Sequence, residues 1–384
     1  MTALISDDPS KTVALPQGEF ILRRYPDDEN LQAWDAADEF LLKQVHDSKI
    51  LQGNDRILLL NDAYGALATA LANYSAYSWN DSFLAQQAMR DNLVANGYPQ
   101  EQVITNAKVE FPAAAVDCVL IKVPKTLAML EYQLYALRGL LHHDTRIIAA
   151  GMARHIHSST LELFESIIGP TTTTRAVKKS RLVLVQRDHS LNEGQSQYPG
   201  SFELEVDRSY QIINHAGVFS RERLDSGSRL LLENMAVGEQ YNRIVDLGCG
   251  NGVLGLIAAA LNPESTLLFC DESHMAIASA SENFQNAHAG TREAEFRVGN
   301  CLQGVDSDSR DLVVSNPPFH LQHSIGDAIA WQMFKDSRRV LVSGGELRIV
   351  GNRHLGYHAK LKKLFGNCTT VATNKKFVIL SAIK

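Results

Sequence analysis

The sequence predicts an α/β protein made of two similar domains that follow each other along the chain. With 384 residues, the chain is longer than one ordinary hydrophobic core accommodates. Short apolar runs alternate with amphipathic segments in both halves, which is typical of a parallel sheet with helices on both faces. Features of the first half recur in the second half in the same order, which indicates an internal duplication.

The first domain is expected to cover residues 1–186. Residues 1–30 show little periodicity, and the amphipathic pattern of residues 31–42 predicts the first helix. Another helix is predicted from leucines at helical spacing, which are Leu127, Leu130, Leu134 and Leu137. The apolar runs that predict buried strands are residues 56–60, 116–121, 146–150 and 181–185.

The second domain is expected to cover residues 202–384, after a polar linker at 187–201. Alternating apolar and polar residues at 202–206 and 210–214 predict a β-hairpin, and the strand and helix pattern starts again at Arg243. The matching stretches of the two halves are 56–60 with 243–247, Asp91-Asn92 with Glu282-Asn283, 117–125 with 311–319, and 169–179 with 366–376. Chance similarity between two α/β halves is the alternative, and the shared order and spacing argue against it.

The tetrapeptide Asn316-Pro317-Pro318-Phe319 follows an expected strand at 311–315, so it lies at the sheet edge where α/β proteins bind ligands. The side-chain oxygen of Asn316 and the carbonyl of Pro317 can accept the two hydrogens of an amine on a flat ring. The prolines hold these acceptors in place, and Phe319 offers a face on which a base can stack. A plain proline turn is the alternative for the tetrapeptide taken alone.

A glycine-rich loop ends the first strand of the second domain, where Asp246 is followed by Gly248, Gly250 and Gly252. A cofactor that lies against the main chain needs glycine there, because a Cβ would occupy its space. Nicotinamide enzymes also use such loops, with the spacing G-x-G-x-x-G. The tighter spacing and the preceding acid resemble the sites that bind S-adenosylmethionine.

Two polar residues end the next strands of the second domain. Asp271 can accept both hydroxyls of a ribose, which suits S-adenosylmethionine and a dinucleotide equally. Asn300 can meet the amino group of an adenine, although an asparagine in a turn is the alternative. The order and spacing of the glycines, Asp271, Asn300 and Asn316–Phe319 are those of class I methyltransferases that act on exocyclic amines. The fold class is therefore predicted as two tandem class I methyltransferase (Rossmann-like) domains.

Composition limits the other possibilities. A hydrophobic content of 45% and a charged content of 21% are those of a folded domain. We expect no signal peptide, and no apolar run is long enough to span a bilayer. The five cysteines are scattered without a C-x-x-C pair, so we expect reduced thiols, a cytoplasmic protein and no metal site. The net charge of -6 argues mildly against a nucleic-acid partner, but basic residues gather near the end of the chain. They are Lys335, Arg338, Arg339, Arg348, Arg353, Lys360, Lys362, Lys363, Lys375, Lys376 and Lys384.

The two halves differ at the positions that would bind ligand. The glycine-rich loop corresponds to residues 61–65, where a single glycine remains, and Asn316–Phe319 corresponds to residues 122–125, which have neither the amide nor the ring. We therefore expect a catalytic second domain and a degenerate first domain that supports it or holds RNA. The basic residues expected to hold RNA in the first domain are Lys122, Lys125, Arg175, Lys178, Lys179 and Arg181.

The chain resembles the ribosomal RNA guanine-N2 methyltransferases, which pair a degenerate half with an active half. Residues 217–221, 224–229 and 316–320 carry the likeness to the whole group. Residues 122–127, 169–174 and 366–370 resemble its large-subunit branch, the large subunit methyltransferase G family.

The resemblance implies S-adenosylmethionine as the methyl donor and a guanosine of 23S rRNA as the acceptor, with N2-methylguanosine as the product. It also implies that Phe219 and Asp225 lie close to the cofactor. On the residues alone, both Phe219 and Asp225 are compatible with ordinary loop positions.

Because two halves are already fused in one chain, we expect a monomer.

Other functions fit parts of the sequence. Enzymes that methylate a glutamine of a protein use a similar Asn-Pro-Pro loop, and methylation of adenine in DNA would use the same acceptors. A scaffold that binds RNA without catalysis fits the first half. It fits the second half badly, because the glycines and Asn316 are present there.

Overall fold

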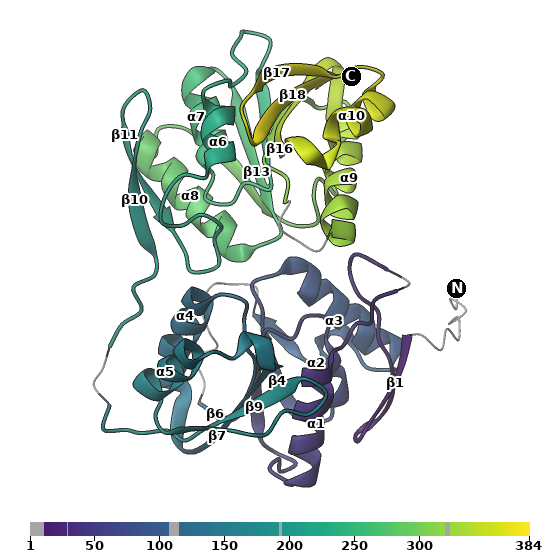
Figure 1. The fold of residues 1–384 in the computed structure, drawn as a ribbon, viewed down its shortest axis with the longest axis vertical. Helices are drawn as coiled ribbons and strands as arrows, with labels where there is room; N and C mark the ends of the chain where they lie inside the picture. Colours follow the sequence, from purple (N-terminus) through teal and green to yellow (C-terminus); the bar gives the residue numbers. More distant parts are fainter. Residues whose placement is uncertain (1–10, 29, 107–114, 192–193, 319–322) are drawn as a thin grey trace. The chain divides into compact units, whose positions relative to one another are not determined.

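The computed structural model describes residues 11–28, 30–106, 115–191, 194–318 and 323–384. The chain divides into two compact units, Met1–Tyr198 and Pro199–Lys384, which are drawn in Figure 1. The division falls within the segment predicted as a linker. No helix in the described part of the chain is both long and apolar enough to cross a membrane.

The N-terminal unit is a seven-stranded sheet in the order β5-β4-β3-β6-β7-β9-β8. The strands from β5 to β7 are parallel, whereas β9 is antiparallel to both β7 and β8. A hairpin of β1 and β2 precedes the sheet. The strands are β1 (Thr12–Leu15), β2 (Gly18–Ile21), β3 (Arg56–Leu60), β4 (Ser75–Trp79), β5 (Ile104–Asn106), β6 (Val116–Lys122), β7 (Leu141–Met152), β8 (Thr171–Thr173) and β9 (Ser180–Val185). The α-helices are α1 (Ala36–Asp47), α2 (Ala66–Ala70), α3 (Phe83–Ala95), α4 (Leu127–Leu137) and α5 (Ser158–Ile167).

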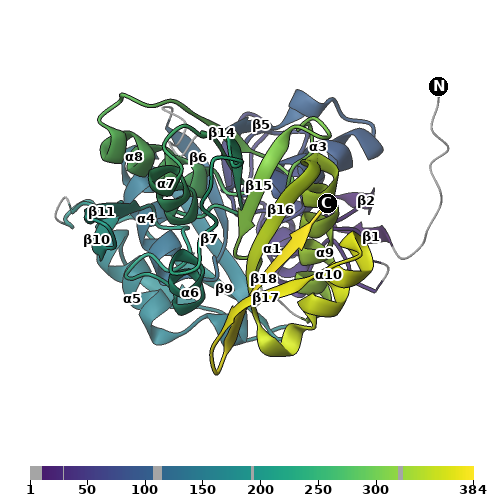
Figure 2. The ribbon, with the colours of Figure 1, turned by 90° about the horizontal axis from the view of Figure 1, so that it is seen from above.

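The C-terminal unit repeats this architecture, with the sheet order β14-β13-β12-β15-β16-β18-β17 and the same antiparallel strand next to the edge. The hairpin of β10 and β11 precedes it (Figure 1). The strands are β10 (Gly200–Glu205), β11 (Ser209–Asn214), β12 (Arg243–Leu247), β13 (Thr266–Asp271), β14 (Ala294–Val298), β15 (Arg310–Ser315), β16 (Leu341–Asn352), β17 (Thr369–Thr373) and β18 (Phe377–Ile383). The α-helices are α6 (Ser226–Leu232), α7 (Val253–Leu261), α8 (His274–His288), α9 (His323–Val340) and α10 (Tyr357–Phe365). Figure 2 shows α9 and α10 beside β16 and β18.

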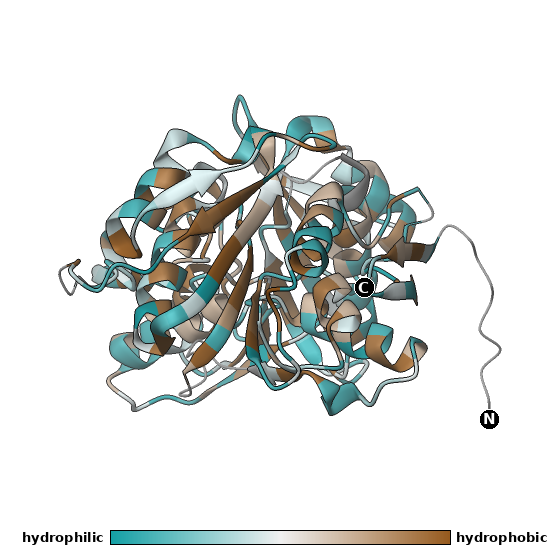
Figure 3. Cartoon of the chain, turned by 90° about the horizontal axis from the view of Figure 1, so that it is seen from below, coloured by the Kyte–Doolittle hydropathy of each residue, from teal (hydrophilic) through white to brown (hydrophobic). Residues whose placement is uncertain are grey.

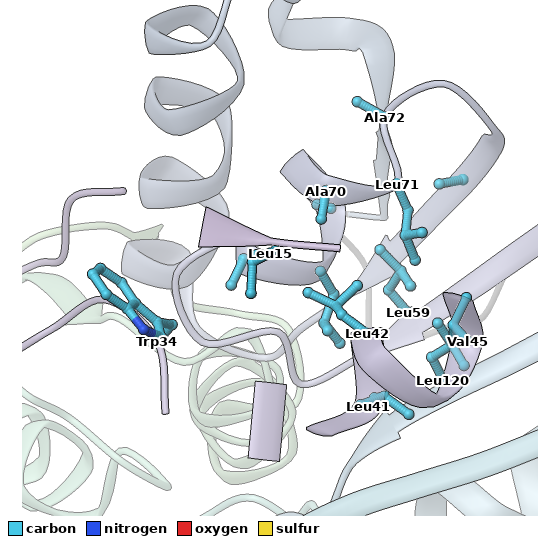
Figure 4. Packing of buried hydrophobic residues seen from close by; sticks show 14 of the residues in the cluster. Leu15, Trp34, Leu41, Leu42, Val45, Leu59, Ala70, Leu71, Ala72 and Leu120 are labelled. Atoms are coloured by element: carbon cyan, nitrogen blue, oxygen red, sulfur yellow. The ribbon is translucent and has the colours of Figure 1, made fainter. Parts of the chain in front are cut away.

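Each sheet has apolar residues on both faces, because its central strands are covered on both sides. In β12, Ile244 belongs to a core with α6, α7 and α8, while Val245 and Leu247 belong to a core with α9 and α10. Such alternation follows from the two-residue period of a strand. Figure 3 shows the matching hydropathy, with hydrophobic colour along the strands and mixed colour around the helices. In the N-terminal unit, leucines of α1 pack on Leu59 and Leu120 (Figure 4).

Three expectations about the elements need correction. The first helix begins at Ala36 and not at residue 31, because Asp35 caps it by accepting from the N–H groups of Ala37 and Asp38. The hairpin of β1 and β2 lies where no periodicity was recognised. The sheets are mixed and not wholly parallel, because residues 174–179 between β8 and β9 are too few for a crossover.

The same pair of contacts joins two neighbouring strands in both units. Asp117 of β6 accepts a hydrogen bond from the main-chain N–H of Arg56 at 2.8 Å, and Asp311 of β15 accepts one from Arg243 at 2.8 Å. The guanidinium Nε atoms of the two arginines add contacts at 3.4 and 3.1 Å. Each arginine is the first residue of the central strand, so the two units fix the start of β3 and β12 in the same way.

Candidate active site

The glycine-rich loop lies between β12 and α7, at the carboxyl edge of the C-terminal sheet. The φ angles of Gly248, Gly250 and Gly252 are 67°, 55° and 78°, a left-handed conformation that side chains strongly disfavour. A Cβ added to Gly250 would meet no protein atom within 4 Å, whereas one added to Gly252 would lie 2.8 Å from the Cβ of Ala280. Gly252 therefore serves packing, and Gly250 presents its main chain to open space.

Polar side chains of neighbouring elements hold this loop. Asp271, the last residue of β13, accepts from the N–H of Gly250 at 2.9 Å and from the N–H of Ser273 at 3.0 Å. Asn283 of α8 donates to the carbonyl of Asn251 at 2.9 Å. The loop is thus held by hydrogen bonds to the strand and the helix that follow it.

Asn316 lies at the end of β15, at the same edge of the sheet. Its Oδ1 atom is buried and has no hydrogen-bond partner among the described residues. A buried amide oxygen without a partner loses its hydration at a cost of about 1–3 kcal/mol. Such an atom fits a group that supplies a hydrogen, as an exocyclic amine does.

The nitrogen of the same amide is held by the start of α6. Asn316 Nδ2 lies 3.0 Å from the hydroxyl oxygen of Ser228 and 3.3 Å from Oδ2 of Asp225. Asp225 is the N-cap of α6 and accepts from the N–H groups of Gly227 and Ser228 with this Oδ2 atom. The contacts of Asp225 that the structure shows are thus with Asn316 and with its own helix.

The remaining predicted residues take different positions. Pro317 is buried and Pro318 is half-buried, while Phe319 lies outside the described residues. Phe219 precedes α6 and is 57% exposed. The Oδ1 atom of Asn300 accepts from Gln332 of α9 at 3.1 Å, which orients its amide.

Asp246 differs from Asp225 and Asp271 because it is fully buried, whereas they are half-buried. Its Oδ2 accepts from the N–H of Gly255 in α7 at 2.7 Å, so it joins the central strand to the helix after the loop. Burial raises the pKa of Asp246 to about 8. Burial also raises the pKa of the thiols of Cys249 and Cys270, which stay protonated near neutral pH.

The raised pKa of Asp246 predicts a dependence of stability on pH. Between the ordinary value of 3.8 and about 8, the folded protein keeps a proton that the unfolded chain releases, so the free energy of unfolding falls as pH rises. Asp246→Asn removes this titration, and its unfolding free energy should fall less over the same range. Urea unfolding at a series of pH values measures both slopes. Equal slopes for the two proteins would show that Asp246 is ionised in the fold.

The N-terminal unit has a different set of groups at the corresponding place. Asn61 follows β3 with a φ of 61°, as Gly248 follows β12. Lys122 ends β6, and its Nζ lies 2.7 Å from Asp35 and 2.6 Å from Asp38. Its side chain is 12% exposed, so the expectation that Lys122 holds RNA is wrong.

Two residues at this edge of the sheet were not predicted from the sequence. Ser228 contacts Asn316, and its position three residues after an acid that can cap a helix was the available signal. Asn352 ends β16, and its Oδ1 is also buried without a partner among the described residues. Nothing in its sequence surroundings distinguishes Asn352 from a turn asparagine.

Comparison with known proteins places the chain in a family. Residues 10–189 match the family model described as RLMG N-terminal domain, and residues 209–381 match the methyltransferase small domain. Ribosomal RNA large subunit methyltransferase G of Klebsiella pneumoniae strain 342 is 50% identical over 95% of this chain and 96% of its own length. The chain belongs to the ribosomal RNA large subunit methyltransferase G family. Family members from Erwinia tasmaniensis and Streptomyces coelicolor are 49% and 45% identical, over 94% and 96% of this chain and 96% and 99% of their own lengths.

A solved structure agrees with the fold of this family member. It is a T. thermophilus 16S rRNA N2 methyltransferase in complex with AdoMet and guanosine. The two structures match with a TM-score of 0.73 at 21% identity, over 97% of each chain. The likeness covers both units, so the order of two α/β sheets is common to the two proteins.

Proposed function

We propose that the protein transfers a methyl group from S-adenosylmethionine to the exocyclic N2 amine of a guanosine in 23S rRNA, giving N2-methylguanosine. The single observation that carries this proposal is the buried Oδ1 of Asn316, which has no partner among the described residues and lies at the sheet edge that also carries the glycine-rich loop. The names of the relatives support the ribosomal RNA substrate.

The cofactor would lie against the glycine-rich loop. Gly250 leaves space for it, and Asp271 would accept from the ribose hydroxyls, since an ionised carboxylate has about four accepting positions. Phe219 and Asn300 would contribute to the wall of the site. Bound S-adenosylmethionine supplies an electrophilic methyl group on a sulfonium.

The chain itself would position the amine. Asn316 Oδ1 and the Pro317 carbonyl would accept its two hydrogens, which turns the nitrogen lone pair out of conjugation with the ring. A methylated amine loses its proton readily, so no strong base is required. Asp246 and the cysteines hold their protons near neutral pH and would take no proton from the amine.

The target guanine has to leave its helix, because a stacked and paired base cannot bring its amine to this edge. The restricted φ angles of Pro317 and Pro318 would hold the two acceptors, Asn316 Oδ1 and the Pro317 carbonyl, in place. Phe319 would stack on the base. Analysis of nucleosides in rRNA from cells that lack the gene tests the substrate. Loss of N2-methylguanosine from 23S rRNA supports the proposal, and an unchanged content with undermethylated protein or DNA overturns it.

A basic rim would contact RNA phosphates next to the site. It consists of Arg353, Lys375 and Lys376, which are all exposed. The N–H of Arg353 donates to the carbonyl of Lys376 at 3.1 Å, so two parts of the rim are adjacent. Arg353 follows β16, which is parallel to β15, and the carboxyl ends of both strands lie at one edge of the sheet.

Charge reversal in this rim should weaken RNA binding. Lys375→Glu together with Lys376→Glu removes two cations, so the affinity for 23S rRNA fragments should fall and the salt slope should decrease by about two. Binding isotherms at several salt concentrations measure both quantities. A second variant reverses Lys178 and Lys179, at the turn where the N–H of Ala153 donates to the carbonyl of Lys179 at 2.7 Å.

This second variant tests whether the N-terminal unit binds RNA. A weaker affinity with Lys178→Glu and Lys179→Glu would support RNA binding by that unit, although Lys178 is paired with Glu39 at 2.6 Å. If the RNA affinity and the salt slope stayed unchanged, Lys178 and Lys179 would not bind RNA, and the N-terminal unit would support the catalytic unit without holding RNA at this turn. If reversal at Lys375 and Lys376 changed neither quantity, the basic rim would not be the RNA surface.

The tandem duplication is part of the proposal. The identical strand order of the two sheets and the recurring Arg–Asp contact at the start of β3 and β12 support it. We infer a catalytic unit after the linker and a degenerate unit before it. The same reasoning favours a monomer that works in the cytoplasm, where rRNA is assembled into ribosomes.

A further inference from the structure

Among the described residues, the contacts that hold the amide of Asn316 come from one side. Both hydrogens of its Nδ2 atom point to the start of α6, where Ser228 Oγ lies at 3.0 Å and Asp225 Oδ2 at 3.3 Å. Asn316 follows β15 and Asp225 precedes α6, so the two residues are 91 positions apart in the sequence. The contact is therefore a product of the fold and not of a local turn.

The chemistry of these groups fixes which way the amide faces. An ionised carboxylate only accepts hydrogen bonds, so the nitrogen of the amide, and not its oxygen, has to face Asp225. Turning the amide by 180° would place two oxygens against each other and leave the nitrogen buried without an acceptor. Oδ1 is consequently held away from α6, where it is buried and has no partner among the described residues.

We propose that Asp225 and Ser228 are positioning residues that orient the amide of Asn316 for the acceptor amine. This inference rests on the proposed function, because it assigns the direction from which the amine hydrogens are accepted. It changes the expected role of Asp225, since a direct cofactor contact would act on binding of S-adenosylmethionine, whereas positioning of Asn316 acts on turnover.

The N-terminal unit contains a parallel arrangement that supports this assignment. Lys122 ends β6 as Asn316 follows β15, and it contacts Asp35 at 2.7 Å and Asp38 at 2.6 Å. Asp35 is the N-cap of α1, as Asp225 is the N-cap of α6, and in each helix the second contact comes three residues later. Both units therefore use the start of the helix before the central strand to hold a donor at the strand end.

The two arrangements differ in what they leave for a ligand. An ammonium has three donors and no acceptor. Lys122 therefore donates to the two acids and has no atom that could accept a hydrogen bond from a ligand. We call the N-cap acid and the residue three positions later the cradle, which is Asp35 with Asp38 in one unit and Asp225 with Ser228 in the other. An amide that donates its hydrogens to a cradle still has its oxygen available to a ligand. The degenerate unit thus keeps the cradle and lacks the acceptor, which indicates that the cradle serves orientation of the strand-end side chain.

The experiment compares variants that remove the cradle stepwise. Ser228→Ala deletes the 3.0 Å contact and leaves the cap of α6 intact. Asp225→Ser keeps a hydroxyl that can cap the helix but is too short to reach Asn316 as well. Asp225→Asn keeps one oxygen that can serve both the cap and Asn316. Asp35→Ser is the matched control, because it alters the equivalent cap in the N-terminal unit.

Each full-length variant is assayed for kcat and KM with a 23S rRNA fragment, for Kd of S-adenosylmethionine by calorimetry, and for Tm. We expect kcat to fall about tenfold with Ser228→Ala and with Asp225→Ser, and further in the double variant, at a Kd for the cofactor within about twofold of the original. Asp225→Asn should recover most of the kcat lost in Asp225→Ser. Asp35→Ser should leave kcat unchanged.

The outcomes separate the possible failures. Full kcat in Ser228→Ala and Asp225→Ser, with an inactive Asn316→Ala, overturns the positioning role and leaves the proposed function intact. A raised Kd for the cofactor with normal kcat at saturation also overturns it and makes Asp225 a cofactor ligand. An active Asn316→Ala overturns the proposed function itself. If Asp225→Ser does not fold, Ser228→Ala alone decides the positioning role.

Discussion

Asn316→Ala is expected to lower kcat about a hundredfold to a thousandfold, with little change in the Kd for S-adenosylmethionine. The variant removes the buried Oδ1 that would accept an amine hydrogen. The Pro317 carbonyl alone cannot keep the lone pair of the guanine amine aimed at the methyl group of the cofactor. Single-turnover methylation of a 23S rRNA fragment measures the rate, and calorimetry measures cofactor binding.

The matched control for this variant is Asn367→Ala in the same unit. In the described part of the chain, its amide bonds main-chain groups of Phe365 and Ile383, near the edge strands, and it is exposed. This control should methylate at the original rate. A normal rate in Asn316→Ala would contradict the proposed grip on the amine, whereas an equal loss in both variants would indicate a general effect on the fold.

Gly250→Ala is expected to raise the Kd for S-adenosylmethionine about a hundredfold. The added methyl group would meet no protein atom within 4 Å, so the space it takes is the space left for the cofactor. The left-handed φ of 55° adds a cost of about 1–2 kcal/mol to folding, and Tm should fall accordingly.

Gly366→Ala separates these two effects. Gly366 has a φ of 83° and also no atom within 4 Å of an added Cβ, but it ends α10. The variant should lower Tm as Gly250→Ala does and leave cofactor binding unchanged. If Gly250→Ala bound S-adenosylmethionine with the original affinity, the cofactor would not lie against this loop.

The sequence predicted most of the architecture because the strands are apolar on both faces. The runs that begin at Arg56, Val116, Arg181 and Arg243 coincide with β3, β6, β9 and β12, and the predicted hairpin is β10 with β11. The hairpin of β1 and β2 escaped notice because each strand has only four residues. The antiparallel strands at the edge of the sheet follow from the short connection between β8 and β9. The periodicity of apolar residues does not reveal whether a connection reverses the direction of the chain.

The site was predictable where one short stretch contains its chemistry. The glycines and Asn316 are recognisable because φ and the side-chain amide are properties of single residues. The cradle of Asp225 and Ser228 is not, because it depends on a helix that packs against a strand end 91 positions later. For the same reason Lys122 was expected to be available to RNA, although the fold encloses it between Asp35 and Asp38.

In the proposed reaction, the C-terminal unit holds an exocyclic guanine amine on Asn316 while a methyl group is transferred to it. The most direct measurement incubates the purified protein and its Asn316→Ala variant with unmodified 23S rRNA and isotopically labelled S-adenosylmethionine, and then identifies the labelled nucleosides by mass spectrometry. We expect labelled N2-methylguanosine with the original protein and almost none with the variant. Label in a different nucleoside, or equal amounts of N2-methylguanosine from both proteins, would contradict the proposed reaction.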